Sequence, residues 1–249
     1  MEGELATGPQ QSSTSGHPSP RGPYRALDRI ANVAAVFVIA NVVLDIFAVV
    51  TDVQMVGLLD RIKSGEAVTF EEADALDVRM FRIGLLQGLG VLIAGIPFVM
   101  WFRRAYRNLG ALGVRLLRFK PGWAVGAWFV PIMNLARPKS IANDIWRATD
   151  PELPADVERP PSSQVSKLLN LLWSAFIVSG ILYSSGNRFV ERPSLEDLLS
   201  EARRFVVADT ISVVAGILAI AVIRAITTRM RLRHEAYRAK TAGDPAVPV

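Results

Sequence analysis

The sequence predicts an all-α membrane protein: a polytopic helix bundle with four spanning helices and a shorter re-entrant or interfacial helical segment. Hydrophobic residues make up 51% of its 249 residues, and the mean hydropathy is positive, which is more apolar than a soluble domain of this size requires. Four apolar runs approach the roughly 20 residues that a spanning helix needs. Basic residues flank these runs, so the net charge of +5 favours cationic collars beside a membrane over nucleic-acid binding.

The chain begins with a polar tail, residues 1–24, which is rich in Gly, Pro, Ser, Thr and Gln. It has almost nothing to bury, and we expect it to be disordered. The first apolar run starts near Ile30, too far from Met1 for a cleavable signal peptide, and is long enough to remain as an anchor. We therefore expect a membrane domain over residues 25–238 and a C-terminal tail over residues 239–249.

The expected spanning helices cover residues 30–50, 83–102, 168–185 and 205–226. A fifth apolar stretch, residues 121–138, is shorter, and Pro131 interrupts it. Whether this stretch crosses the membrane decides whether the two termini lie on the same side.

The charges flanking the runs resolve the topology, because short cytoplasmic loops carry an excess of Lys and Arg. Residues 52–82 hold seven acidic and four basic side chains and belong outside, whereas residues 103–120 hold six basic and no acidic ones and belong inside. The segments before the first run and after the last are also basic, so both termini are expected inside and the number of crossings is even. Residues 121–138 are then re-entrant or interfacial, and the four spanning helices should cradle them, because a broken backbone at membrane depth needs protein or water partners.

A weak internal repeat supports this arrangement. Thr69 and Ser194 are each followed three positions later by an acidic residue, which is a capping-box signature. Each is followed by a short amphipathic helix, an arginine and a span dotted with small residues. We expect these short helices in the two outer loops.

Polar and small residues mark the faces that pack inside a membrane bundle. Asn41, Asp45 and Asp52 share one face of the first span, Gly84, Gln87 and Gly88 share one face of the second, and Asp209 opens a similar face on the last.

Asp45 and Asp209 fall in the outer half of the membrane, where a carboxylate is costly unless it is paired or neutral. Arg82, Arg203 and Arg204 stand at the matching level. One interpretation is a buried ion pair or hydrogen-bond network that fixes helix register. The other is an outward-facing polar site for a cation, a proton or a small cationic ligand. The candidate polar site comprises Asn41, Asp45, Arg82, Arg204 and Asp209.

The stretch 121–138 is the second candidate. Its tryptophans suit the membrane interface, while its prolines break the helix and place an amide and a guanidinium among freed carbonyls. It is either an inner-leaflet anchor or the lining of a pocket open to the cytoplasm. The following helix places Ile141, Ile145 and Ala148 on one face and could lie on the membrane surface. The residues of this motif are Trp123, Trp128, Pro131, Asn134, Arg137, Pro138, Trp146 and Arg147.

A cationic collar alternates Leu and Val with Arg after the second span. Attraction of about 1 kcal/mol per basic residue to anionic lipid accounts for such a pattern, and a recognition site is the alternative. The collar consists of Arg103, Arg104, Arg107, Arg115 and Arg118.

Several kinds of chemistry find no support. The absence of cysteine excludes disulfides and thiolate sites, and His17 and His234 lie in polar terminal segments. No nucleophile elbow or phosphate-binding glycine loop is present. We therefore expect no cofactor, no metal and no enzymatic activity.

The motifs "WFRRAYRNL" and "PGWAVGAWFVPIMNLARPKSIANDIWRATDP", an Asn170 to Trp173 element and Asp209 together resemble the family called domain of unknown function 4328. The resemblance runs from about residue 29 to residue 233. It departs from the family at Leu172, where adjacent tryptophans are frequent. The resemblance implies a bacterial multi-pass protein of the cytoplasmic membrane with no established activity.

Two functional classes remain open besides a membrane enzyme, for which no constellation is visible. The first is a structural or binding module that engages anionic lipid, a protein partner or a second copy of the chain at the cytoplasmic face. The second is a small transporter or channel that uses Asp45 and Asp209. A water-filled path between these carboxylates and the cytoplasmic side would favour transport.

Overall fold

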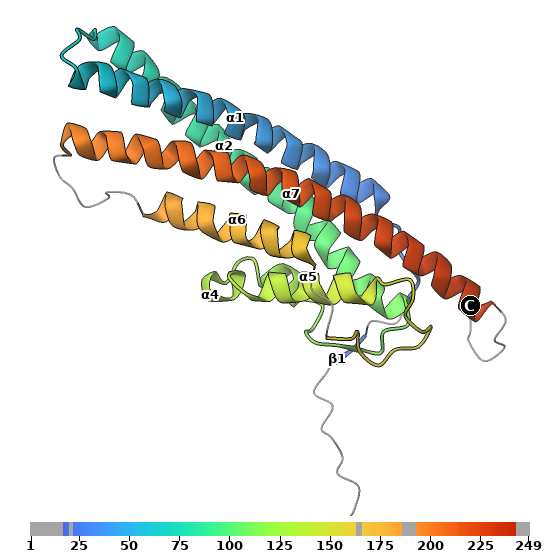
Figure 1. Ribbon diagram of the computed structural model, residues 1–249. Helices are drawn as coiled ribbons and strands as arrows, with labels where there is room; N and C mark the ends of the chain where they lie inside the picture. The colour runs from blue at the N-terminus through green and yellow to red at the C-terminus, as the bar shows by residue number, and fades with distance from the viewer. Residues whose placement is uncertain (1–16, 20–21, 163–165, 186–192, 243–249) are drawn as a thin grey trace, which may run out of the picture.

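The computed structural model describes residues 17–19, 22–162, 166–185 and 193–242. Four long helices form an elongated bundle, and the short elements gather at one end of it (Figure 1). In chain order the elements are β1 (His17–Pro18), α1 (Asp28–Lys63), α2 (Phe70–Ala111), β2 (Leu116–Leu117), α3 (Trp123–Gly126), α4 (Pro131–Asn134), α5 (Arg137–Ala148), α6 (Lys167–Ser184) and α7 (Leu195–Thr241).

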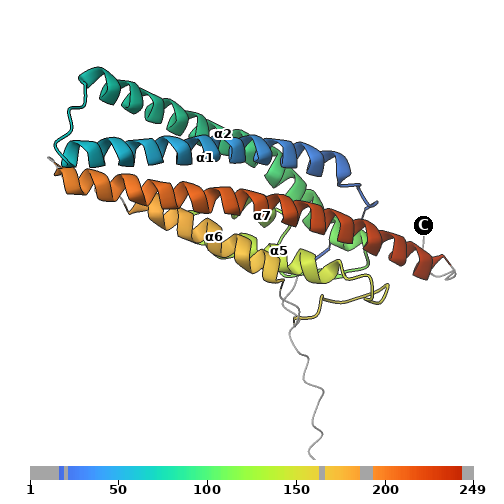
Figure 2. The same cartoon turned by 45° about the horizontal axis from the view of Figure 1, so that its top comes forward.

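The four long helices α1, α2, α6 and α7 are each long and apolar enough to cross a membrane. This confirms the predicted class, an all-α membrane bundle with four spanning helices. Helix α1 packs against α2 and α7, and α6 packs against α7, on the side away from α1 in both views (Figures 1 and 2). Strand β1 and the C-terminal end of α7 lie at the same end of the bundle, as an even number of crossings requires.

The two ends of the bundle differ in charge. We call the end where α1 begins and α2 and α7 finish the basic end, and the end where α2 and α7 begin the acidic end.

Residues 1–16, 20 and 21 lie outside the described residues, as do 243–249, so the predicted disorder of the tails stays a prediction. Within the segment expected to be a disordered tail, β1 pairs antiparallel with β2, and Tyr24 stacks on His234 with ring centroids 3.9 Å apart.

The helix starts at the acidic end follow the predicted caps. The Thr69 hydroxyl accepts from the backbone N–H of Glu72, and Ser194 and Asp197 form a reciprocal capping box. The outer amphipathic segments are nevertheless not separate helices, because no Gly or Pro interrupts residues 70–83 or 195–205 and each continues into its span. With 42 residues, α2 is about 63 Å long, twice the hydrocarbon thickness of a bilayer.

The acidic end is held by a small apolar cluster and exposed ion pairs. Leu59 of α1 packs against Leu199 and Ala202 of α7. Lys63 pairs with Glu196 at 2.6 Å on the surface around this cluster. Both side chains of that pair are at least half exposed, so the ion pair adds little to the unfolding free energy. The buried apolar side chains of the cluster contribute more.

The main core lies at the basic end and includes α5. Ile141, Ile145 and Ala148 are fully buried in a cluster with Trp101 of α2 and Met230 of α7. The expectation that α5 could lie on the membrane surface is therefore wrong: its apolar face packs on protein. An apolar stripe can be covered by lipid or by protein, and the pattern alone does not distinguish them.

The stretch 121–138 forms α3 and α4, each of four residues and therefore about 6 Å long. Neither can span a bilayer, so the stretch does not form a fifth spanning helix. Phe129 and Ile132, where α3 turns into α4, are 75% and 84% exposed. Large exposed apolar side chains at a chain reversal suit a segment that dips into lipid.

Arg233 closes the basic end. Its guanidinium is fully buried and donates to the backbone carbonyls of Leu112 (3.1 Å), Leu153 (2.6 Å) and Pro154 (2.6 Å). Gly113, at φ +86°, has no room for a side chain, because a Cβ would lie 1.7 Å from the carbonyl oxygen of Ala155. The loop after α2, the segment after α5 and the last helix are thereby fixed to one another.

Candidate functional site

A polar cluster lies inside the bundle, with Gln87 of α2 at its centre. The side-chain amide Nε2 of Gln87 donates to Asp45 Oδ1 of α1 at 2.9 Å and to Asp209 Oδ1 of α7 at 2.7 Å. Asp45 and Asp209 are 5% and 3% exposed. One neutral side chain therefore joins two buried carboxyls from different helices.

The fourth spanning helix, α6, also contributes to this cluster. The Tyr183 hydroxyl donates to Asp209 Oδ1 at 2.6 Å and lies 3.2 Å from Ser212 Oγ. Asn41 donates its amide to Asp45 Oδ2 at 3.4 Å. All four spanning helices meet at these side chains, which fixes their relative positions.

Asp52 extends the cluster along α1. It lies two turns beyond Asp45 on the same face, is 5% exposed, and its carboxyl interacts with that of Asp209. Its oxygen Oδ2 is buried and has no hydrogen-bond partner in the part of the chain that the structure describes. Burying such an acceptor without a partner costs roughly 1–3 kcal/mol, so the hydrogen bonding of the cluster is incomplete at this oxygen.

The arginines considered as partners lie elsewhere. Arg204 donates to the carbonyl of Leu182 and pairs with Glu201 at 3.0 Å, and Arg203 pairs with Asp60 at 3.3 Å. Arg82 is exposed on α2. The side chains of Asn41, Gln87 and Tyr183, and not these arginines, donate the hydrogen bonds described above to Asp45 and Asp209. The sequence pattern placed Gln87 on the inner face of its span, but nothing in it singled out Tyr183.

A cavity of about 1670 Å³ adjoins the cluster, and residues from all four spanning helices line it. Lining residues toward the acidic end include Asp45, Asp52, Gln87, Tyr183 and Asp209. Toward the basic end they include Arg103, Arg104, Arg107, Trp128 and Asn134. The two groups of polar side chains that the sequence singled out therefore border one continuous space.

The glycine face of α2 borders this cavity instead of packing on another helix. Gly84 and Gly88 have open space where a Cβ would lie, so the prediction that they form a close helix contact is wrong. The close contact with α1 is made by Gly90, where a Cβ would lie 2.5 Å from Asn41 Oδ1. Small residues show where close approach is allowed, and the partner helix decides which of them is used.

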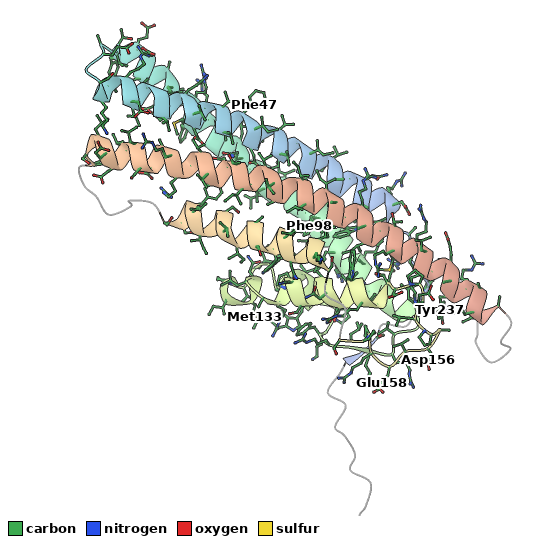
Figure 3. The ribbon with its side chains drawn as sticks, viewed as in Figure 1. Phe47, Phe98, Met133, Asp156, Glu158 and Tyr237 are labelled. Atoms are coloured by element: carbon green, nitrogen blue, oxygen red, sulfur yellow. The ribbon has the colours of Figure 1, made fainter. Side chains whose placement is uncertain are left out.

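The stretch 121–138 lines the cavity toward the basic end and is held there by aromatic contacts. Trp128 meets Phe98 and Phe102 of α2 edge-on, with centroids 5.4 and 5.8 Å apart, and Trp173 of α6 at 6.2 Å. Figure 3 shows Phe98 inside the bundle, Phe47 on the outward side of α1, and Met133 on the side of α4 away from α6. Trp128 Nε1 and Asn134 Oδ1 are buried without a hydrogen-bond partner among the described residues.

The other residues of the motif hold local structure. Arg137 lies over the Trp123 ring at 4.2 Å, and Arg229 of α7 lies over the Trp146 ring at 4.4 Å. Pro131 and Pro138 stand in the first turns of α4 and α5, where proline is tolerated. Arg147 pairs with Asp144 at 3.7 Å.

The five collar arginines divide into two groups. Arg104 donates to the carbonyl of Ala26 at 3.4 Å, Arg115 pairs with Asp156 at 3.1 Å, and Arg118 lies over the Phe119 ring. Arg103 and Arg107 are exposed, line the cavity, and make no hydrogen bond or ion pair with the residues that the structure describes. These two are the collar residues best placed to take a ligand.

A metal site is not apparent in the described ranges: they contain no group of three or more His, Cys, Asp or Glu side chains that could hold an ion. The cluster is instead a set of carboxyls, amides and a phenol beside a largely apolar cavity.

The fold and this buried polar cluster define a polytopic helical membrane protein. Residues 64–228 match the family described as Domain of unknown function (DUF4328), and the chain belongs to this family. The resemblance carried by the tryptophan and proline motif is thereby confirmed. Searches of curated proteins and of solved structures find no match.

Proposed function

We propose that the protein is a membrane binding module that holds an anionic glycerophospholipid at its basic end. We place this end at the cytoplasmic face of a bacterial cell membrane, because the excess of Arg there follows the positive-inside rule. Arg103 and Arg107 stand four residues apart on one face of α2 and border the cavity. Two neighbouring guanidiniums that have no hydrogen-bond or ion-pair partner among the described residues suit a phosphate group.

The cavity below these arginines suits the rest of the lipid. Trp128 packs on Phe98, which lies five residues, or about 8 Å, from Arg103 along α2. The indole N–H of Trp128, which has no partner among the described residues, can donate to an ester carbonyl of a lipid whose phosphate contacts Arg103. Ala94 and Val91 continue the cavity lining beyond that level and can contact an acyl chain. The observation that carries the proposal is the juxtaposition of Arg103, Arg107 and Trp128 on one cavity.

The test is fluorescence quenching of the full chain, reconstituted in phosphatidylcholine with increasing amounts of brominated phosphatidylglycerol. Bromine on an acyl chain beside Trp128 and Trp173 quenches their emission. We expect brominated phosphatidylglycerol to quench at a lower mole fraction than brominated phosphatidylcholine. Replacing both Arg103 and Arg107 by Gln should weaken this preference by at least tenfold, since each charge contributes about 1 kcal/mol.

The matched control replaces Arg115 and Arg118 by Gln, which removes the same charge from the collar but not from the cavity. If the two double variants lost the preference for phosphatidylglycerol equally, the collar would attract anionic lipid through its overall charge and not through a binding site at Arg103 and Arg107. Protection from both brominated lipids would mean that protein, such as a second copy of the chain, covers the cavity.

A transporter or channel is the second candidate, and the continuity of the cavity between Asp209 and Arg103 favours it. Flux of ions or small cations into proteoliposomes would test this alternative. The Asp209→Asn variant should then lose flux while the Arg103→Gln and Arg107→Gln double variant keeps most of it. Equal flux in wild type and the Asp209→Asn variant would exclude that role.

A further inference from the structure

We propose that the polar cluster binds the ammonium group of an amphiphilic organic cation. Three carboxyls, those of Asp45, Asp52 and Asp209, are buried inside the bundle at 3–5% exposure, and all three residues line the cavity. The side chains of Asn41, Gln87 and Tyr183 that donate to Asp45 and Asp209 are neutral amide and phenol groups, and the Asp52 carboxyl interacts with that of Asp209. Buried carboxylates require positive charge or protons, so the cluster is complementary to a cation.

The unpartnered oxygen of Asp52 indicates where the cation binds. Asp52 Oδ2 is buried without a hydrogen-bond partner in the described part of the chain, and Asp52 lines the cavity. Gln87 and Tyr183 already donate to Asp45 and Asp209 and do not satisfy this oxygen. A ligand in the cavity that carries N–H donors can supply the missing hydrogen bond together with the missing charge.

An ammonium group fits this cluster better than a bare metal ion does. The described residues offer no set of three or more carboxylate or imidazole ligands around one point. The other buried and unpartnered oxygen of the cluster, Asn41 Oδ1, lies eleven residues from Asp52 on α1, or about 16 Å away along the helix. One ion cannot contact both atoms, whereas an ammonium group needs only one or two carboxylates and an apolar place for its carbon atoms.

The cavity supplies that apolar place. Its volume of about 1670 Å³ exceeds the roughly 300–1000 Å³ of typical small-molecule sites. Ile83 and Phe205 line it near the carboxyls. A cation with a hydrocarbon body can therefore bury its chain against these walls while its ammonium group contacts Asp52.

The proposed cation site is independent of the lipid site, which uses Arg103 and Arg107. If the protein is a transporter, an amphiphilic organic cation is the class of substrate that this site would bind. The two sites lie toward opposite ends of the cavity. Residue 87 of the cluster and residue 103 of the lipid site are sixteen residues apart on α2, or about 24 Å. Variants in one site therefore report on that site alone.

Isothermal titration calorimetry tests the inference, with the full chain in nanodiscs of phosphatidylcholine and hexylammonium as the probe. Hexanol serves as the uncharged probe of the same chain length, and empty nanodiscs give the heat of partitioning. We expect saturable binding of hexylammonium and none of hexanol. Asp52→Asn should weaken hexylammonium binding at least tenfold, and Asp74→Asn, on the exposed surface of α2, should leave it unchanged.

Thermal unfolding separates this result from a folding defect. Because Asp52→Asn removes an ionisable carboxyl buried beside that of Asp209, it should raise the ligand-free unfolding temperature while it weakens binding. A variant that lost binding through misfolding would instead show both a lower affinity for hexylammonium and a lower unfolding temperature. Wild-type affinity in the Asp52→Asn variant, or equal binding of hexanol and hexylammonium to the wild type, would overturn the proposal.

Discussion

The indole N–H of Trp173 donates to the backbone carbonyl of Leu135 over 3.0 Å. Trp173 stands six residues into α6, so this bond reaches about 9 Å along the spanning helix from its start. Leu135 is the C-cap of α4, and the carbonyls at the end of a helix have no intrahelical partners. The Trp173 indole thus supplies the hydrogen bond that water would give to this carbonyl outside a membrane. A helix break at membrane depth needs such a partner from the protein.

We predict that Trp173→Phe lowers the unfolding free energy by about 1–2 kcal/mol, because it leaves the Leu135 carbonyl without its donor but keeps an aromatic ring against Trp128. Trp123→Phe is the matched control, since the contact of Trp123 with Arg137 uses the face of the ring. Unfolding in a denaturing detergent would measure both variants. Equal losses would show that the Trp173 bond contributes nothing beyond ring packing.

Arg233→Gln should be the most damaging single change at the basic end. It removes a buried guanidinium that serves three carbonyls, and we expect a loss of about 3 kcal/mol or more. Arg231→Gln provides the comparison, because the ion pair of Arg231 with Asp28 at 3.8 Å is half-exposed. Losing this pair should cost less than about 1 kcal/mol. Similar unfolding temperatures for the two variants would contradict this assignment.

The stability of α5 should depend on pH through Asp144. Burial raises the pKa of the Asp144 carboxyl from 3.8 to about 6, while Arg118 and Arg147 offset part of this effect. Since the folded state binds this proton more tightly than the unfolded state, the stabilisation is complete below about pH 4. The unfolding free energy then falls by about 3 kcal/mol as the pH rises to about 6.

Asp144→Asn removes that titration. The difference in unfolding temperature between this variant and the wild type should grow in favour of the variant as the pH rises from about 4 to about 6. Asp156→Asn, a change to an exposed carboxylate, should follow the wild-type curve. A parallel pH dependence in wild type and the Asp144→Asn variant would show that Asp144 is not the titrating group.

Cysteine labelling in intact cells would test the orientation, for which the chain offers a cysteine-free background. Introduced cysteines at Arg118, Glu152 and Lys240 should be protected from an impermeant reagent, whereas one at Gly57 should react. Position 113 is unsuitable, because a side chain there would collide with Ala155. Labelling at position 152 but not at 57 would reverse the assignment of the two faces.

The sequence predicted those features that depend on neighbouring residues. The four spans follow from apolar length, and the caps at Thr69 and Ser194 follow from residues three positions apart. The inward faces of Asp45 and Asp209 follow from helical periodicity. These patterns depend on residues close together in the sequence, so they can be read without knowing which helix packs on which.

The remaining features depend on which surfaces meet. Periodicity placed Gln87 inside, but only the packing of α1 and α7 lets one amide reach two carboxyls. Periodicity also did not predict that Gly84 would border a cavity, or that Ile141 would be covered by protein instead of lipid. Lipid and protein interiors are equally apolar, so hydrophobicity alone does not separate them.

The position of Arg233 also constrains the order in which the chain can assemble. Leu112 precedes Arg233 by 121 residues, so the loop after α2 is synthesised long before the guanidinium that its carbonyl binds. Leu153 and Pro154 meet the same side chain. The four helices can associate as each is inserted, but the basic end closes only after residue 233 has emerged from the ribosome. The protein should therefore remain open at that end until synthesis is almost complete.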